Sequence, residues 1–196
     1  MDSIAAIVAK KAACRAEALA RRDALSPDVR RAAAEAIAAR PLPVEARAGL
    51  TVSGFMPIKS EINPLPLLLR FGEAGARLAL PAIDGRGKPL RMRLWAAGEK
   101  LVAGQWGIRE PGPDAAEVEP DVMLVPLAAF DRRGRRIGYG AGYYDMTIAA
   151  LRAKKRVIAI GVAFAAQEVP EVPIMAHDAK LDLVLTEREA IDCRGA

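Results

Sequence analysis

The chain has 196 residues, of which 52% are hydrophobic and 27% are charged, and its formal net charge is +5. This composition is too apolar for a disordered protein, and the length suits one domain better than two, so we expect a single domain over residues 1–196. No uninterrupted apolar run approaches the roughly 18 residues of a membrane-spanning helix, so we expect no membrane partner. The positive charge indicates anionic ligands or nucleic acid. Cys14 and Cys193 have no metal-ligand spacing and indicate free thiols in a reducing cytoplasm, where we expect the protein to work.

Helical spacing of apolar residues predicts a first helix that ends near Leu25. Ser26 followed by Pro27 predicts the capped start of a second helix, which Pro41 ends. Residues 49–57 are typical of a buried strand, and residues 63–70 predict the start of a third helix.

The rest of the chain alternates short apolar runs with turn-rich segments. Residues 104–120 are rich in Gly, Pro and acidic residues, which predicts a loop. The other elements expected are strands at 77–81, 90–96, 121–125, 157–164 and 181–185, with a helix at 143–153. This alternation predicts an α/β fold: a three-layer α/β/α domain with a largely parallel or mixed central sheet.

Residues 131–145 form a corner rich in glycine and arginine, which we call the glycine corner. Gly138, Gly140 and Gly142 permit backbone conformations that let successive N–H groups converge on an anion, while the arginines add charge. The corner is neither a Rossmann nor a P-loop motif, because Tyr143 stands where the former needs glycine and no Gly-Lys-Ser/Thr is present. A tight turn with solvated arginines at 132, 133, 135 and 136 is the alternative.

The full order Asp131-x-x-Gly134-x-Arg136-Ile137-Gly138-Tyr139-Gly140-x-Gly142-Tyr143-Tyr144-Asp145 resembles the 5-formyltetrahydrofolate cyclo-ligase family, also called methenyltetrahydrofolate synthetases. Further family-like features run along the chain: Lys11 and Arg15, Glu61, the segment 106–111, Phe164-x-x-Gln167, and His177-Asp178. The resemblance implies an enzyme that uses ATP and Mg²⁺ to convert 5-formyltetrahydrofolate to 5,10-methenyltetrahydrofolate, releasing ADP and phosphate. Its chemistry runs through a phosphorylated formyl group, an iminium phosphate, without a protein nucleophile.

The resemblance also implies a role for individual residues. The ATP-binding residues are Lys11, Arg15, Arg136, Ile137, Gly138, Tyr139, Gly140, Ala141, Gly142, Tyr143 and Tyr144. The folate-binding residues are Met56, Glu61, Trp106, Tyr139, Gly140, Ala141, Gly142 and Tyr143, and the magnesium side consists of Asp145 and Asp178. Ala141 stands where relatives often have Gly or Lys, and the lone histidine, His177, is assigned no role.

Each assignment has a structural alternative. Lys11 and Arg15 lie four residues apart and share a helix face, which is equally typical of a solvated basic stripe, and Lys10 is the rival of Lys11. Glu61 and Asp145 are alternatively acids that compensate a helix dipole, and Asp178 is alternatively a capping residue. Trp106 is alternatively a core residue.

Two other functions stay open at this point. A sugar-phosphate isomerase or a CoA-transferase-like enzyme would keep the phosphate corner on a similar fold but would turn over without ATP. A basic nucleic-acid-binding module is the non-enzymatic alternative, although no RRM, KH or helix-turn-helix signature supports it. We expect no nucleic-acid partner, and a monomer or a weak dimer.

Overall fold

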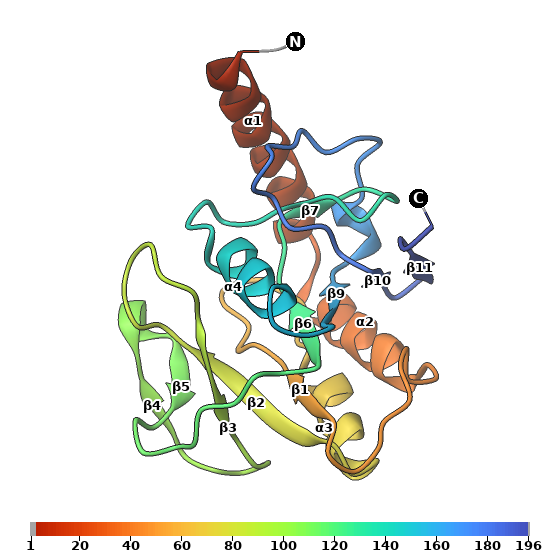
Figure 1. The fold of residues 1–196 in the computed structure, drawn as a ribbon. Helices are drawn as coiled ribbons and strands as arrows, with labels where there is room; N and C mark the ends of the chain where they lie inside the picture. The colour runs from red at the N-terminus through yellow and green to blue at the C-terminus, as the bar shows by residue number, and fades with distance from the viewer. Residues whose placement is uncertain (1–2, 196) are drawn as a thin grey trace.

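The structure is a computed structural model that describes residues 3–195 (Figure 1). Its helices are α1 (Ile4–Asp23), α2 (Pro27–Ala39), α3 (Leu65–Glu73) and α4 (Tyr143–Arg152), with the 3-10 turns η1 (Gln105–Gly107) and η2 (Ala165–Gln167). The strands are β1 (Thr51–Ser53), β2 (Arg77–Ala82), β3 (Arg91–Leu94), β4 (Leu101–Ala103), β5 (Arg109–Pro111), β6 (Val122–Val125), β7 (Ala129–Phe130), β8 (Arg136–Ile137), β9 (Ile158–Val162), β10 (Leu183–Leu185) and β11 (Ala190–Asp192).

Within the described residues, seven strands form the central sheet in the order β11-β10-β9-β6-β1-β2-β3. The five inner strands pair in parallel, while β3 and β11 run antiparallel at the two edges. The remaining strands form two antiparallel hairpins, β4–β5 and β7–β8. The sheet is therefore mixed and largely parallel, as the sequence predicted.

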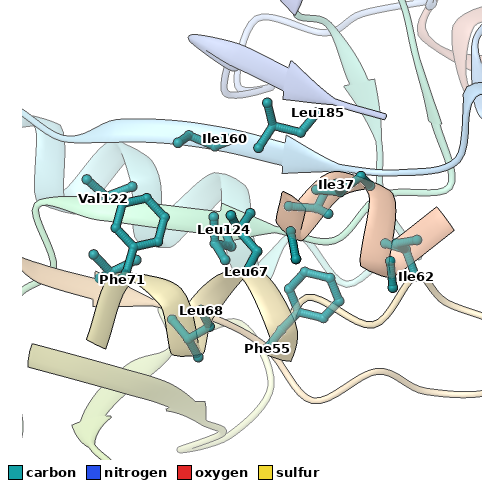
Figure 2. Packing of buried hydrophobic residues seen from close by; sticks show 14 of the residues in the cluster. Ile37, Phe55, Ile62, Leu67, Leu68, Phe71, Val122, Leu124, Ile160 and Leu185 are labelled. Atoms are coloured by element: carbon teal, nitrogen blue, oxygen red, sulfur yellow. The ribbon is translucent and has the colours of Figure 1, made fainter. Parts of the chain in front are cut away.

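The inner strands are buried on both faces, and alternate residues of each strand enter different cores. Leu124 of β6 belongs to a cluster that the helices α2 and α3 cover, whereas its neighbour Met123 packs with residues of α4. Figure 2 shows the first cluster, in which Phe71 points toward Val122 and Leu67 toward Leu124 of the sheet. The molecule is thus a three-layer α/β/α structure, which confirms the predicted fold class.

The predicted boundaries of α2 are confirmed at its caps, whereas α3 begins at Leu65, two residues after the predicted start at 63. Ser26 accepts a hydrogen bond from Val29 N, Pro27 is the first helical residue, and α2 ends at Ala39, before Pro41. The predicted strand at 49–57 was too long, because only Thr51–Ser53 pair with neighbouring strands. After Ser53 the chain leaves the sheet and passes along the functional cavity described below.

Two elements of the sheet and its surroundings differ from the sequence prediction. Residues 104–120 are not all loop, because Arg109–Pro111 pair with Leu101–Ala103 in a hairpin. The 3-10 turn η1 connects the two strands of this hairpin. The edge strand β11 was missed, since Ile191 is the one buried residue of its three. Strands this short carry too few apolar residues to show an alternating pattern.

Helix α1 lies at the end of the sheet rather than on either face, and it packs against the β7–β8 hairpin (Figure 1). Ala18 of α1 is fully buried there against Ala129 and Ile137. In residues 3–195, none of the helices combines the length and the apolar character that crossing a membrane requires. This end position brings one face of α1 over the glycine corner.

Candidate active site

A cavity of about 650 Å³ opens where β1 and β6 end at their carboxyl termini. Strand order reverses at this pair, since β2 follows on one side of β1 and β9 on the far side of β6, and such switch points are where open α/β sheets bind ligands. Every residue that the family resemblance implied lines this one cavity: Lys11, Arg15, Met56, Glu61, Trp106, Arg136, Ile137, Gly138, Tyr139, Gly140, Ala141, Gly142, Tyr143, Tyr144, Asp145 and Asp178. Side chains from distant parts of the sequence therefore converge on a single space.

The glycine corner runs from the β7–β8 hairpin into the N-terminus of α4. Gly140 and Gly142 have φ values of 99° and 70°, which L side chains adopt only with strain. Gly142 is the N-cap of α4 and has no side chain to satisfy the first N–H groups of the helix. The first residues of α4 line the cavity, and a helix N-terminus with open N–H groups is a candidate anion site, which we call the anion site.

Gly138 does not have the left-handed conformation that Gly140 and Gly142 have, because its φ is not in that region. A Cβ at this position would lie 3.2 Å from Nη1 of Arg136, closer than ordinary contacts allow. Its carbonyl oxygen accepts a hydrogen bond of 2.8 Å from Nε of Arg15. Gly138 therefore gives room to one arginine and anchors another.

Two ion pairs lie side by side at the α4 end of the cavity. Asp145 accepts from Nη2 of the buried Arg136 at 2.8 Å, and Asp178 pairs with Lys11 from α1. Ala179 N, next to Asp178 in the chain, donates to Asp145 Oδ1 at 3.0 Å and so brings the two pairs together. The result is a cluster of two cations and two carboxylates next to the anion site.

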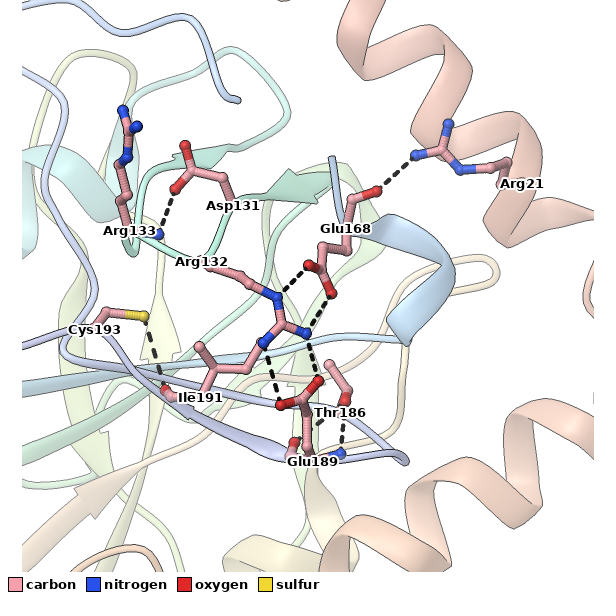
Figure 3. Close-up of polar contacts among 9 residues, drawn as sticks. All are labelled: Arg21, Asp131, Arg132, Arg133, Glu168, Thr186, Glu189, Ile191 and Cys193. Atoms are coloured by element: carbon pink, nitrogen blue, oxygen red, sulfur yellow. Dashed lines mark hydrogen bonds and ion pairs between the residues drawn. The ribbon is translucent and has the colours of Figure 1, made fainter. Parts of the chain in front are cut away.

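The other three arginines of the glycine corner do not line the cavity, and the prediction that they add charge to the anion site was wrong. Arg132 binds Glu168 and Glu189, while Arg133 and Arg135 both pair with Glu171. Figure 3 shows the Arg132 cluster, with Glu168 also tied through its backbone to Arg21 of α1. The charges of these three arginines are therefore paired with glutamates of the same chain.

Glu61 and Tyr139 form a second polar group, on the β1 side of the cavity. Oε2 of Glu61 accepts from Ile58 N at 2.8 Å, so the carboxylate closes the turn that follows β1 rather than compensating the α3 dipole. Burial raises the pKa of Glu61, while hydrogen bonds from Tyr139 and Ile58 and the charge of Arg22 oppose the shift. Burial, and then the Glu61 carboxylate, raise the pKa of the Tyr139 hydroxyl.

Trp106 is not a core residue, because 66% of it is exposed. It lies at the turn of the β4–β5 hairpin with a left-handed φ of 57°, and its ring centroid is 6.1 Å from that of Tyr143. The hydroxyl of Tyr143 is buried and has no hydrogen-bond partner within residues 3–195. A buried polar atom without a partner is costly, and in a cavity wall it indicates a contact that a ligand completes.

The carboxylates fit magnesium only in part. No group of three or more His, Cys, Asp or Glu side chains in residues 3–195 is placed to hold a metal ion. Mg²⁺, however, keeps several waters and usually takes one or two carboxylates together with substrate phosphates. In the described structure, Asp145 and Asp178 each accept side-chain hydrogen bonds through only one of their two carboxylate oxygens. The two carboxylates therefore suit a Mg²⁺ ion that arrives with a polyphosphate.

The sequence prediction missed two polar residues at the site. Glu110 lines the cavity and accepts from Ile83 N at 3.2 Å, but its motif had suggested no role. Arg22 lies directly behind the cavity, 2% exposed, where it binds Tyr139. Its spacing of seven from Arg15 and eleven from Lys11 places all three on one helix face, a signal that the surrounding basic residues obscured.

The fold and the cavity define a class: a doubly wound α/β protein with a cavity at the switch point of a largely parallel sheet and a helix N-terminus in the cavity wall. A model of the 5-formyltetrahydrofolate cyclo-ligase family matches residues 7–187. The chain therefore belongs to the 5-formyltetrahydrofolate cyclo-ligase family, a family of enzymes.

Individual relatives agree with the family match. The chain is 40% identical to the 5-formyltetrahydrofolate cyclo-ligase of Mycolicibacterium smegmatis over 151 residues, which cover 73% of this chain and 76% of the relative. It is 33% identical to the Escherichia coli K12 protein of the same name over 142 residues, 69% of this chain and 77% of that one. The NMR structure of Aquifex aeolicus 5,10-methenyltetrahydrofolate synthetase superposes with a TM-score of 0.77 at 29% identity, covering 94% of this chain and 93% of that chain.

Proposed function

We propose that the chain converts 5-formyltetrahydrofolate to 5,10-methenyltetrahydrofolate with ATP and Mg²⁺, releasing ADP and phosphate, and that one domain carries the whole activity. The observation that supports this most strongly is the convergence of all the expected ligand residues on one cavity of about 650 Å³. Cations and an open helix N-terminus lie in one part of it, and Glu61 with Tyr139 in another. The two unpaired cysteines are consistent with a reducing cytoplasm, where we propose the enzyme works.

The reaction needs ATP because the oxygen of an N-formyl group is a poor leaving group. In the proposed chemistry the formyl oxygen attacks the γ-phosphorus, and the bond from that phosphorus to the bridging oxygen breaks as ADP leaves. N10 then attacks the formyl carbon and loses its proton, and the bond from carbon to the phosphorylated oxygen breaks to release phosphate. Such transfers ask a protein mainly for positioning and charge neutralisation.

The cation cluster supplies that neutralisation. Lys11, Arg15 and Arg136 line the cavity beside the N–H groups of α4, so their positive charges and the helix dipole act on the same bound phosphates. Bound Mg²⁺ would neutralise phosphate charge, and Asp145 and Asp178 would hold it. Their existing partners, Arg136 and Lys11, keep both carboxylates oriented.

The folate would lie between the anion site and Glu61. A carboxylate accepts hydrogen bonds but does not donate them, which suits the N–H groups of the pterin ring. Met56 and the ring of Tyr143 add apolar walls, and Trp106 lies at the mouth where a flat ring system can stack. In this arrangement the formyl oxygen is presented toward the γ-phosphate.

The test is an absorbance assay with the purified full chain, 5-formyltetrahydrofolate, ATP and Mg²⁺. We expect the near-ultraviolet absorbance of methenyltetrahydrofolate to rise only when all three are present, with one ADP formed for each product molecule. Turnover without ATP would instead favour an isomerase or transferase. A folded protein that forms neither product nor ADP would refute the proposal.

Lys11 and Lys10 offer a matched pair of variants. Lys11 lines the cavity and pairs with Asp178, whereas its neighbour Lys10 is exposed and does not line it. We expect Lys11→Met to lose activity, with the KM for ATP raised by about tenfold or more, since a charge-assisted hydrogen bond contributes about 1.5–3 kcal/mol. Lys10→Met should behave like the wild type, and the reverse result would move the phosphate site off this helix face.

A further inference from the structure

Arg22 is a charged residue that the proposed chemistry leaves without a task, although it is only 2% exposed. It lies in the last turn of α1, where Nε donates to Ser60 Oγ at 3.0 Å and to Asp23 Oδ1 at 3.2 Å. Nη1 donates to the hydroxyl oxygen of Tyr139, and Cζ is 5.8 Å from the centre of the tyrosine ring. Burying a guanidinium is costly unless it is paired and hydrogen-bonded, and each of these contacts compensates part of that cost.

The contact with Arg22 sets the direction of the Tyr139 hydroxyl proton. An arginine can only donate, so the phenolic oxygen must accept from it. The one proton of that hydroxyl is then free to be donated to another group, and the Glu61 carboxylate lines the same cavity as Tyr139. Oriented contacts therefore run from Ser60 through Arg22 to Tyr139, and they leave the hydroxyl proton of Tyr139 available to an acceptor in the cavity such as Glu61.

Arg22 also completes a row on α1. Lys11, Arg15 and Arg22 are four and then seven residues apart, so at 3.6 residues per turn they lie within about 40° of one another around the helix. Arg15 holds the carbonyl of Gly138, and Arg22 holds the hydroxyl of the next residue, Tyr139. One rigid helix thus fixes both the phosphate part and the Glu61 part of the cavity.

We propose that Arg22 is a positioning residue for the folate half of the site: by donating to the Tyr139 oxygen it directs the Tyr139 hydroxyl proton toward the Glu61 carboxylate, which accepts from the pterin N–H groups. This inference rests on the proposed function. Arg22 touches neither the substrate nor the reacting atoms, and it acts through Tyr139 and Glu61. Its loss should therefore impair folate binding while leaving ATP binding nearly unchanged.

Because charged groups surround Glu61, the pH dependence of kcat/KM is a suitable measurement of the role of Arg22. Arg22 faces it from α1 and is itself paired with Asp23, which also binds the neighbouring Ser60. Other titratable groups near Glu61 in the described structure are Arg30, Arg31, Glu35, Lys59, Tyr139 and Tyr144. Burial already raises the pKa of Glu61, and the Arg22 charge and the Tyr139 hydrogen bond oppose that shift. Removing either should raise this pKa further and move the acidic limb of the kcat/KM profile to higher pH.

The experiment compares Arg22→Met with Arg21→Met in the full chain. Arg21 is the matched control, because it is exposed and donates only to the carbonyl oxygens of Ala166 and Glu168. We expect Arg22→Met to raise the KM for 5-formyltetrahydrofolate about tenfold or more, to change the KM for ATP by less than about threefold, and to shift the acidic limb upward. Arg21→Met should match the wild type in all three.

A second pair of variants keeps the inference testable if Arg22→Met does not fold. Tyr139→Phe should raise the folate KM selectively and move the limb in the same direction, and adding Arg22→Lys to it should have little further effect. Additive effects, or equal changes in both KM values with an unmoved limb, would overturn the inference. An inactive wild type would overturn the proposed function and the inference together, whereas an active wild type with unselective variants would overturn the inference alone.

Discussion

The buried hydroxyl of Tyr143 makes a prediction in which stability and binding change in opposite directions. Tyr143 is 9% exposed and lines the cavity, and its hydroxyl finds no partner within residues 3–195. An unsatisfied buried polar group costs about 1–3 kcal/mol. Tyr143→Phe removes that group while keeping the ring, so the ligand-free protein should gain about 1 kcal/mol of unfolding free energy. For a chain of this size the gain corresponds to a Tm higher by about 2–4 °C.

The same substitution should weaken binding, because the hydroxyl is the group that a ligand would satisfy. A hydrogen bond contributes about 0.5–1.5 kcal/mol net, so the KM of the substrate that contacts it should rise about 2- to 12-fold. Differential scanning calorimetry without ligands and initial rates with each substrate varied give the two quantities. A lower Tm with both KM values unchanged would show that the hydroxyl has an internal structural role and would refute the reasoning.

Three further predictions concern the two carboxylate groups and the glycine corner. Asp145→Asn removes the ionic partner of a buried arginine, so it should lower the unfolding free energy by about 2–4 kcal/mol and raise the Mg²⁺ concentration needed for half-maximal rate. The surface control Asp192→Asn should change neither quantity. If the two variants behave alike in chemical denaturation and in metal titration, the prediction is contradicted. Gly140→Ala places alanine at a φ of 99°, so it should lower the unfolding free energy by about 1–2 kcal/mol and remove much of the activity. Gly112 has open space around it, and Gly112→Ala should change neither the unfolding free energy nor the activity in the same assays. Glu61 has a raised pKa in the folded state, so its stabilising contribution is full below the ordinary glutamate pKa of about 4.3 and is lost as pH rises through the folded value. The Tm of Glu61→Gln should therefore rise relative to that of the wild type as the pH is raised above about 4.3, and a difference in Tm that does not change with pH would count against a buried charge at this site.

The parts of the fold that the sequence predicted are those with strong local signals. Ser26 and Pro27 began α2 as expected, because capping and a fixed proline φ act within a few residues. The β4–β5 hairpin and β11 escaped prediction since their pairing partners, rather than their own composition, make them strands. Their three-residue lengths leave no alternation to recognise.

The site residues, like the elements of the fold, were predicted where the local sequence carries a strong signal. The order of residues 131–145 identified the family, and with it the residues that the structure gathers around one cavity. Composition alone did not separate Arg136, which lines the cavity, from Arg132, which binds Glu168 and Glu189. Only the family resemblance singled out Arg136, because the distinction depends on which glutamates fold back onto the hairpin. Arg22 was hidden for the same reason, since burial behind Tyr139 is a property of the assembled fold.

The most direct test of the central claim, that one cavity holds ATP and folate together, is a crystal structure with a non-hydrolysable ATP analogue, Mg²⁺ and 5-formyltetrahydrofolate. We predict triphosphate at the N-terminus of α4, pterin against Glu61, and the formyl oxygen about 3–3.5 Å from the γ-phosphorus, the separation of a near-attack geometry. Folate bound outside this cavity, or a formyl group directed away from the triphosphate, would contradict the account.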